Sequence, residues 1–151
     1  MCALKLTTTK EIDFYSSLSG TFIELPLVAT GISAGFPSPA EDYLDTGMDL
    51  NQEIVKNPAT TFYGRVKGLS MKDEGIFPND ILVVDKSLEP KNGDLAVCFI
   101  DGEFTLKRIS KKRDCIYLMP ANPDYKPVKV TEENDFIVWG IVTYVIKKTR
   151  S

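Results

Sequence analysis

The sequence predicts a compact, mainly β domain of mostly antiparallel strands, preceded by a flexible N-terminal arm and two short helices. From Thr60 onward, segments rich in β-branched and aromatic residues follow one another, as is typical of strands. Turn-forming Gly, Pro, Asn and Asp residues separate these segments. One separator, Asp101-Gly102, has the composition of a two-residue type I′ turn, which joins neighbouring antiparallel strands.

The chain before residue 38 predicts an arm, one strand and a linker. The first 20 residues are rich in Thr and Ser and lack periodicity, which indicates a mobile arm. Thr21–Ala29 has the composition of a strand, and Pro26 restricts it to a sheet edge because proline has no N–H to donate. Residues 30–37 are small and include two glycines, which favours an extended segment that a protease can reach.

Two short helices are expected between the linker and the main strands. Ser38-Pro39-Ala40-Glu41 combines a capping serine, a proline suited to the first helical position and an acidic residue that completes a capping box. This first helix is expected to end near Gly47. Asp49-Leu50-Asn51-Gln52 repeats the capping pattern, and Asn57-Pro58 stops the second helix.

The rest of the chain predicts six strands. They are Thr61–Lys67, Ile81–Asp85, Leu95–Ile100, Glu103–Ile109, Cys115–Met119 and Phe136–Lys147. The last of these includes the longest apolar stretch, 11 residues, which is too short to span the ~30 Å hydrocarbon core of a membrane. No signal peptide is apparent at the N-terminus, so a cytoplasmic protein is expected.

Composition limits the classes of function. A chain of 151 residues with 43% hydrophobic and 26% charged residues is expected to form about one globular domain. Its 18 basic and 21 acidic residues give a net charge of -3, which argues against a dedicated DNA-binding module. The one candidate for a basic patch is Lys107–Arg113.

The chain contains no histidine, which excludes Ser-His-Asp and Cys-His catalysis and any zinc site with a histidine ligand. A hydrolase built from this chain would need Lys, Asp, Glu or a bound water as its base. The three cysteines, Cys2, Cys98 and Cys115, form no C-x-x-C pair and support neither a disulfide framework nor a zinc site. Neither a metal nor a cofactor is expected.

The register of the predicted hairpin gives Lys107 unusual surroundings. A two-residue turn places Ala96 opposite Lys107, and alternation then puts Lys107 on one face with Cys98 and Ile109. Burial on such an apolar face lowers the pKa of a lysine, which is the condition for a lysine general base. On periodicity alone, a solvated lysine on an edge strand is the more common case.

A second candidate lies where a predicted strand ends at Gly68. Ser70 follows this glycine just before a short helical turn, where free backbone N–H groups can stabilise an oxyanion. Taken alone, this position is better explained by an ordinary serine N-cap. Neither Ser70 nor Lys107 by itself identifies a catalytic site.

Several blocks of the sequence, taken together and in order, form a more specific pattern than any single motif. They are Ala34–Tyr43, Asp49–Gln52, Gly68-Leu69-Ser70-Met71, Asp80–Asp85, Asp101–Lys107, Leu118–Pro123 and Val138–Val142. Together they resemble the UmuD branch of the LexA-like self-cleaving serine proteases. The resemblance runs from about Leu25 to Lys147 and covers little of residues 1–24. Leu69 departs from it, because many relatives have a polar residue there.

The resemblance implies a fold of the LexA/UmuD C-terminal type and a Ser–Lys dyad. Ser70 would be the nucleophile and Lys107 the general base. The scissile bond would join Ala34 to Gly35, both small enough to let the backbone lie close to the nucleophile. In the family, a RecA–single-stranded-DNA filament promotes this self-cleavage.

Such a cut would divide the chain into a flexible arm, residues 1–34, and a Ser–Lys peptidase-type β domain, residues 35–151. The resemblance implies that the larger product serves the SOS response as a dimeric accessory subunit of an error-prone, UmuC-like Y-family translesion DNA polymerase. The expected partners are therefore a second copy of the chain, the RecA filament and the polymerase. Neither membrane binding nor direct sequence-specific DNA binding is expected.

Three other functions remain open. The chain could be a non-enzymatic module that binds a polymerase or the sliding clamp and keeps the dyad as a vestige. It could be a prophage regulator of the same family, although only 34 residues precede the expected cut and they lack a capped helix pair. A signal-peptidase-like enzyme shares the Ser–Lys chemistry but requires a membrane anchor or a basic amphipathic helix.

Overall fold

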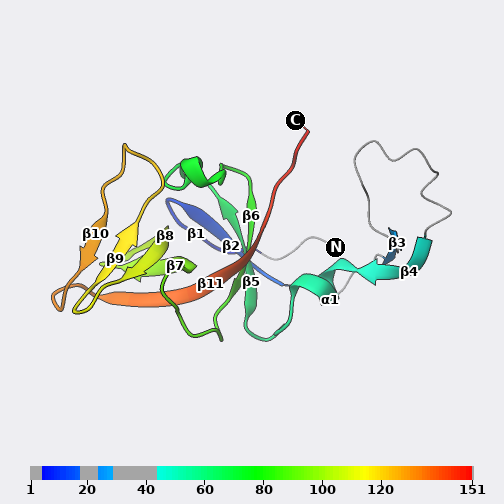
Figure 1. Cartoon of the computed structure of the whole chain (residues 1–151), viewed down its shortest axis with the longest axis horizontal. Coiled ribbons are helices and arrows are strands. Elements are labelled where there is room, and N and C mark those ends of the chain that lie inside the picture. Colours follow the sequence, from blue (N-terminus) through cyan, green and yellow to red (C-terminus); the bar gives the residue numbers. More distant parts are fainter. Residues whose placement is uncertain (1–4, 18–23, 29–43, 151) are drawn as a thin grey trace.

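The computed structural model describes residues 5–17, 24–28 and 44–150 (Figure 1). Its elements are β1 (Lys5–Thr8), β2 (Ile12–Ser16), β3 (Glu24–Val28), β4 (Leu44–Asp49), α1 (Leu50–Ile54), β5 (Thr61–Val66), β6 (Ile81–Asp85), β7 (Leu95–Ile100), β8 (Glu103–Lys111), β9 (Ile116–Met119), β10 (Val128–Val130) and β11 (Phe136–Ile146), with a 3₁₀ turn at Lys72–Glu74. The predicted mainly β, mostly antiparallel fold is confirmed.

Nine of these strands form one sheet in the order β1-β2-β5-β6-β11-β7-β8-β9-β10, and β3 pairs separately with β4. The pairing is antiparallel throughout. The long strand β11 joins the two halves of the sheet, because its first half pairs with β7 and its second half with β6 (Figure 1). Two register shifts interrupt β11, and such bulges bend a strand and increase its twist.

The core consists of two clusters of buried side chains. The larger contains Ile12, Phe14, Val66, Met71, Ile76, Leu82, Val84, Leu95, Val97 and Leu106. The smaller contains Ala96, Cys98, Ile109, Leu118 and Ile141. Because Val97 belongs to one cluster and its two neighbours to the other, the alternation along β7 supplies apolar side chains to both faces of the sheet. Lys107 lies on the face of the smaller cluster, as the predicted register requires.

The predicted hairpin and its register are confirmed. Asp101 and Gly102 have φ values of 48° and 88°, so both residues adopt the left-handed conformation that a type I′ turn needs. β7 and β8 pair with Ala96 opposite Lys107 and Cys98 opposite Thr105. The six predicted strands all form, with ends that differ by at most two residues.

The mobile arm expected over the first 20 residues is wrong for two segments. β1 and β2 form a hairpin that continues the large sheet, because β2 pairs with β5 along its whole length. Ile12 and Phe14 are both buried, so this hairpin contributes to the core. The physical reason is apolar burial. Alternating Ile12 and Phe14 give β2 one apolar face, and the edge of β5 supplies its backbone partners.

The predictions for residues 21–58 had mixed outcomes. An edge strand is confirmed at β3, which pairs only with β4 among the described residues. The first helix is wrong where it can be seen, because residues 44–47 belong to β4. Isolated short helices are marginal, and pairing with β3 satisfies the same backbone groups. The second helix is confirmed as α1, where the Asp49 carboxylate accepts a hydrogen bond from the Asn51 N–H. It ends at Ile54, before Asn57-Pro58.

The division of the chain at residues 34 and 35, and the start of the first helix at Ser38, lie outside the described residues. Both stay predictions.

A short strand that the sequence pattern did not indicate, β10, pairs with β9 at one end of the sheet (Figure 1). It has only three residues and follows a proline, so neither its length nor its alternation gave a usable signal.

Gly140→Ala is expected to lower the free energy of unfolding by about 1 to 3 kcal/mol. A Cβ atom at position 140 would lie 2.5 Å from Cγ1 of Val84, whose side chain is fully buried. The added methyl group would therefore displace a core side chain on β6. Urea denaturation measures the change, with Glu133→Ala on an exposed turn as the control, expected to stay within about 0.5 kcal/mol. Equal stability of the two variants would contradict this close packing.

Candidate active site

Lys107 lies in the middle of β8 and is 5% exposed. Burial lowers the pKa of this lysine, and the nearby Glu11 carboxylate opposes that effect. Its Nζ donates a short hydrogen bond to Oγ1 of Thr105 and lies 3.5 Å from Oε1 of Glu11. The solvated edge-strand position that periodicity alone favours is therefore wrong, and Lys107 has the desolvated position that the hairpin register allowed.

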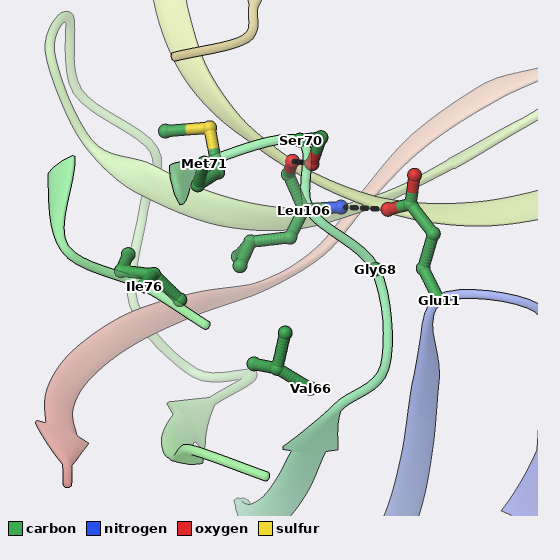
Figure 2. Close-up of a pocket in the computed structure, with 7 residues that line it drawn as sticks. All are labelled: Glu11, Val66, Gly68, Ser70, Met71, Ile76 and Leu106. Carbon is green, nitrogen blue, oxygen red and sulfur yellow. Dashed lines mark hydrogen bonds between the residues drawn. The ribbon is translucent and has the colours of Figure 1, made fainter. Parts of the chain in front are cut away.

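Ser70 lies on the loop that follows β5 and is 4% exposed. Its hydroxyl donates a hydrogen bond of 3.1 Å to the carbonyl oxygen of Leu106, as Figure 2 shows. The 3₁₀ turn that comes next has Met71 at its N-cap, without a side-chain cap hydrogen bond. Ser70 is thus not a capping serine, and its hydroxyl points to the strand that carries Lys107.

The structure brings the loop that carries Ser70 against β8 at Leu106, the neighbour of Lys107 in the chain, but does not join the two side chains. The Ser70 hydroxyl bonds to the residue immediately before Lys107, while the ammonium bonds to Thr105 and Glu11. Within the part of the chain that the structure describes, no hydrogen bond links the two side chains. Proton transfer from Ser70 to Lys107 therefore requires both groups to exchange their present partners.

Glu11 is a site residue that the sequence pattern did not indicate. It lies in the turn between β1 and β2, and its Oε2 accepts a hydrogen bond of 3.0 Å from the N–H of Leu106 (Figure 2). The same oxygen accepts a hydrogen bond of 3.0 Å from Oγ1 of Thr105. Ninety-six positions along the chain separate it from Lys107. No local motif marks this glutamate, because its place depends on the pairing of β2 with β5.

A second loop supports the loop that carries the nucleophile. The N–H of Ala121 donates to the carbonyl oxygen of Ser70 at 2.8 Å, and the buried Asn122 donates through Nδ2 to the carbonyl oxygen of Leu69 at 2.9 Å. The side chain of Leu69 is 44% exposed and points outward. The unusual leucine at this position therefore leaves the loop contacts intact, since the backbone makes them.

Two cavities adjoin the candidate dyad. A small one of about 10 Å³ lies beside Ser70, Leu106 and Glu11 (Figure 2). A larger one of about 510 Å³ borders Lys107, whose Nζ lies 5.7 Å from the centre of the Tyr125 ring. The larger cavity has room for an extended peptide segment beside the lysine.

Cys98 is a further ionisable group close to Lys107. Burial raises the pKa of its thiol to about 12, with Lys107 acting in the opposite direction. The thiol therefore remains protonated at neutral pH and is a poor nucleophile. Cys98 therefore acts as a small apolar side chain of the core.

The remaining sequence predictions concern the cleavage site, the basic patch and membrane insertion. Ala34 and Gly35 lie outside the described residues, so the scissile bond stays a prediction. Lys107–Arg113 is not a continuous basic face, because Lys107 is buried and Arg108 pairs with Glu74. None of the helices in the described ranges is long and apolar enough to cross a membrane.

Comparison with known proteins identifies the family. The family model described as Peptidase S24-like matches residues 26–143. Protein SamA of Salmonella typhimurium is 45% identical over 126 residues, which cover 83% of this chain and 87% of SamA. Protein MucA of Escherichia coli is 37% identical over 137 residues, covering 89% of this chain and 92% of MucA. The LexA repressor of Ectopseudomonas mendocina is 32% identical over 125 residues, covering 82% of this chain and 60% of the repressor.

The family match spans the loop that carries Ser70 and the strand that carries Lys107. SamA and MucA align over most of their own length, whereas the repressor extends well beyond the aligned part. The expected resemblance is confirmed. The chain belongs to the peptidase S24-like family of self-cleaving serine proteases, on its UmuD-like branch of SOS mutagenesis proteins.

Proposed function

We propose that this protein cleaves its own chain between Ala34 and Gly35, with Ser70 as nucleophile and Lys107 as general base. The observation that carries the proposal is that a buried serine donates a hydrogen bond to Leu106, the residue immediately before a buried lysine, in a chain of this family. The chain has no histidine, so lysine is the base that the geometry offers.

The chemistry follows from the residues. Neutral Lys107 takes the hydroxyl proton of Ser70, whose oxygen attacks the carbonyl carbon of Ala34. The bond to Gly35 breaks, and its nitrogen leaves as an amine after taking a proton from the Lys107 ammonium. Water then hydrolyses the ester between Ser70 and Ala34, which frees the new carboxylate and regenerates the serine.

Two features support this role for the loop around Ser70. Among the described residues, the N–H groups of Ser70 and Met71 donate to no backbone carbonyl, and the proposal assigns them to the oxyanion. The substrate belongs to the same chain, and tethering supplies it at a high effective concentration. Little binding surface is then needed beyond the cavity beside Lys107.

The proposed reaction is slow at rest for structural reasons. The Ser70 hydroxyl is engaged with Leu106, and the Lys107 ammonium with Glu11 and Thr105. A RecA–single-stranded-DNA filament is proposed to promote the rearrangement. The product, residues 35–151, would then act in the cytoplasm as a dimeric accessory subunit of an error-prone, UmuC-like Y-family polymerase.

The experiment is mass spectrometry of the purified full-length protein after incubation at pH ~10, which deprotonates lysine. A fragment that begins at Gly35 is expected from the wild type and from the control Ser110→Ala, which changes a serine at the far end of β8. Ser70→Ala should remain uncut, and Lys107→Ala should yield at most a trace of the fragment. A wild-type chain that stays whole at every pH and with RecA filaments would refute self-cleavage.

One observation favours a second function, a non-enzymatic polymerase-binding module. The hydroxyl of Ser70 and the ammonium of Lys107 are engaged with other groups and not with each other. For such a module, Ser70→Ala would retain full activity in a cell-based mutagenesis assay. For the proposed protease, the same substitution removes both cleavage and mutagenesis, and supplying residues 35–151 directly restores mutagenesis.

A further inference from the structure

The turn between β1 and β2 lies against both segments that carry the candidate dyad. On the side of Ser70, the carbonyl oxygen of Glu11 accepts a hydrogen bond of 2.7 Å from the Lys67 N–H. Nζ of Lys67 donates to the carbonyl oxygen of Thr9 at 2.8 Å. Gly68 adjoins the same side chain, because a Cβ atom there would lie 3.4 Å from Cγ of Glu11, at ordinary van der Waals distance.

On the side of Lys107, the Glu11 carboxylate bonds to three consecutive residues of β8. One oxygen accepts from Thr105 Oγ1 and Leu106 N–H, and the other lies 3.5 Å from Lys107 Nζ. The carboxylate therefore spans the stretch of strand to which the Ser70 hydroxyl also bonds (Figure 2). The side chains of Lys107 and Glu11 are 6% and 21% exposed, so solvent screens this ion pair less than a surface pair.

The other groups that face Lys107 are a thiol, an aromatic ring and a hydroxyl. On β7, the Cys98 thiol stays protonated because burial raises its pKa to about 12. On the loop between β9 and β10, Tyr125 presents its ring face. On β8 itself, Thr105 contributes a hydroxyl. Among the described residues, Glu11 is the only acidic side chain within ion-pair distance of Lys107.

We propose that Glu11 is an autoinhibitory positioning residue: the β1–β2 hairpin holds Lys107 as an ammonium and away from Ser70 until Glu11 is withdrawn. This inference rests on the proposed function, since it concerns the base of the same dyad. Charge accounts for its direction. A carboxylate beside the lysine favours the protonated form, and a protonated lysine cannot accept the Ser70 proton.

The first test measures the lysine directly and does not depend on cleavage. In full-length Ser70→Ala protein labelled with ¹³C at the lysine side chains, NMR titration follows Lys107, assigned from the spectrum of the corresponding Lys107→Ala variant. Adding Glu11→Gln, which keeps an oxygen acceptor for the Leu106 N–H, is expected to lower the pKa of Lys107 by about one unit. Glu53→Gln, on the exposed surface of α1, should leave it unchanged. An unchanged or higher pKa in the Glu11→Gln protein overturns the proposal.

The second test measures self-cleavage against pH without a RecA filament. Because one pKa unit is a tenfold change in the neutral fraction, Glu11→Gln should cleave about tenfold faster than the wild type at neutral pH. At high pH, where Lys107 is neutral in both proteins, the two rates should converge. Slower cleavage at every pH would instead make Glu11 an aid to catalysis and overturn its inhibitory role.

Two controls keep the outcomes distinct. Circular dichroism shows whether Glu11→Gln folds, and Glu11→Ala, which removes the acceptor as well as the charge, should shift the pH profile in the same direction. If neither wild type nor variant is cut at pH ~10, the proposed self-cleavage fails while the NMR titration still decides whether Glu11 holds the lysine proton.

Discussion

Replacing Phe14 with alanine is expected to lower the free energy of unfolding by about 3 to 5 kcal/mol. Phe14 is 1% exposed in the larger core cluster. Its ring centre lies 5.1 Å from that of Phe104 and 4.8 Å from that of Trp139, so β2 packs against β8 and β11 through three aromatic rings. Truncation would leave a cavity that the two remaining rings, held by different strands, cannot close.

Urea denaturation followed by tryptophan fluorescence measures this change, because Trp139 is the single tryptophan and lies beside Phe14. Phe77→Ala is the matched control, since Phe77 is 44% exposed and its loss should cost less than about 1 kcal/mol. A similar small effect for both variants would show that the N-terminal hairpin does not form part of the core.

The C-terminal part of the fold can be predicted because its signals are local. Strong strand composition lies between clear turns, and the type I′ turn at Asp101-Gly102 determines the register of β7 against β8 by itself. That register is sufficient to place Lys107 opposite Ala96. It does not decide that the lysine is buried, because β8 becomes an inner strand only through its pairing with β9.

The N-terminal part cannot be predicted in the same way because its signals depend on distant partners. β2 has only five residues, and its partner β5 begins 45 residues after β2 ends. At residues 44–47 the local helix signals are outweighed by the pairing of β4 with β3. Tertiary context commonly overrides short-range propensity in this way.

The candidate site shows the same contrast. Ser70 and Lys107 follow from motif order and strand register, both of which can be read along the chain. Glu11 does not, because it reaches Lys107 only through the pairing of a strand that the sequence pattern does not reveal. The residues that perform the proposed reaction are thus easier to predict than the residue proposed to restrain it.

The rate of self-cleavage is expected to rise with pH and then level off as Lys107 loses its proton. Only the neutral amine can accept the Ser70 proton, so the rate should increase about tenfold per pH unit below the pKa of the lysine and become constant above it. Because burial lowers the pKa of Lys107, the plateau should begin at a lower pH than an exposed lysine would give. Quantitative mass spectrometry of the fragment against time, at a series of pH values, gives this profile.

Two substitutions identify the group responsible. Lys107→Ala should lower the rate on the plateau by between about 10² and 10⁴-fold, the usual contribution of a general base. Lys107→Arg keeps a positive charge beside Glu11, but a guanidinium does not lose its proton in proteins, so this variant should be uncut across the whole range. Cleavage of the arginine variant with the wild-type pH profile would mean that another group titrates. If only the alanine variant were inactive, Lys107 would be needed for its charge and not for its basicity, and the base would have to be sought elsewhere in the cavity.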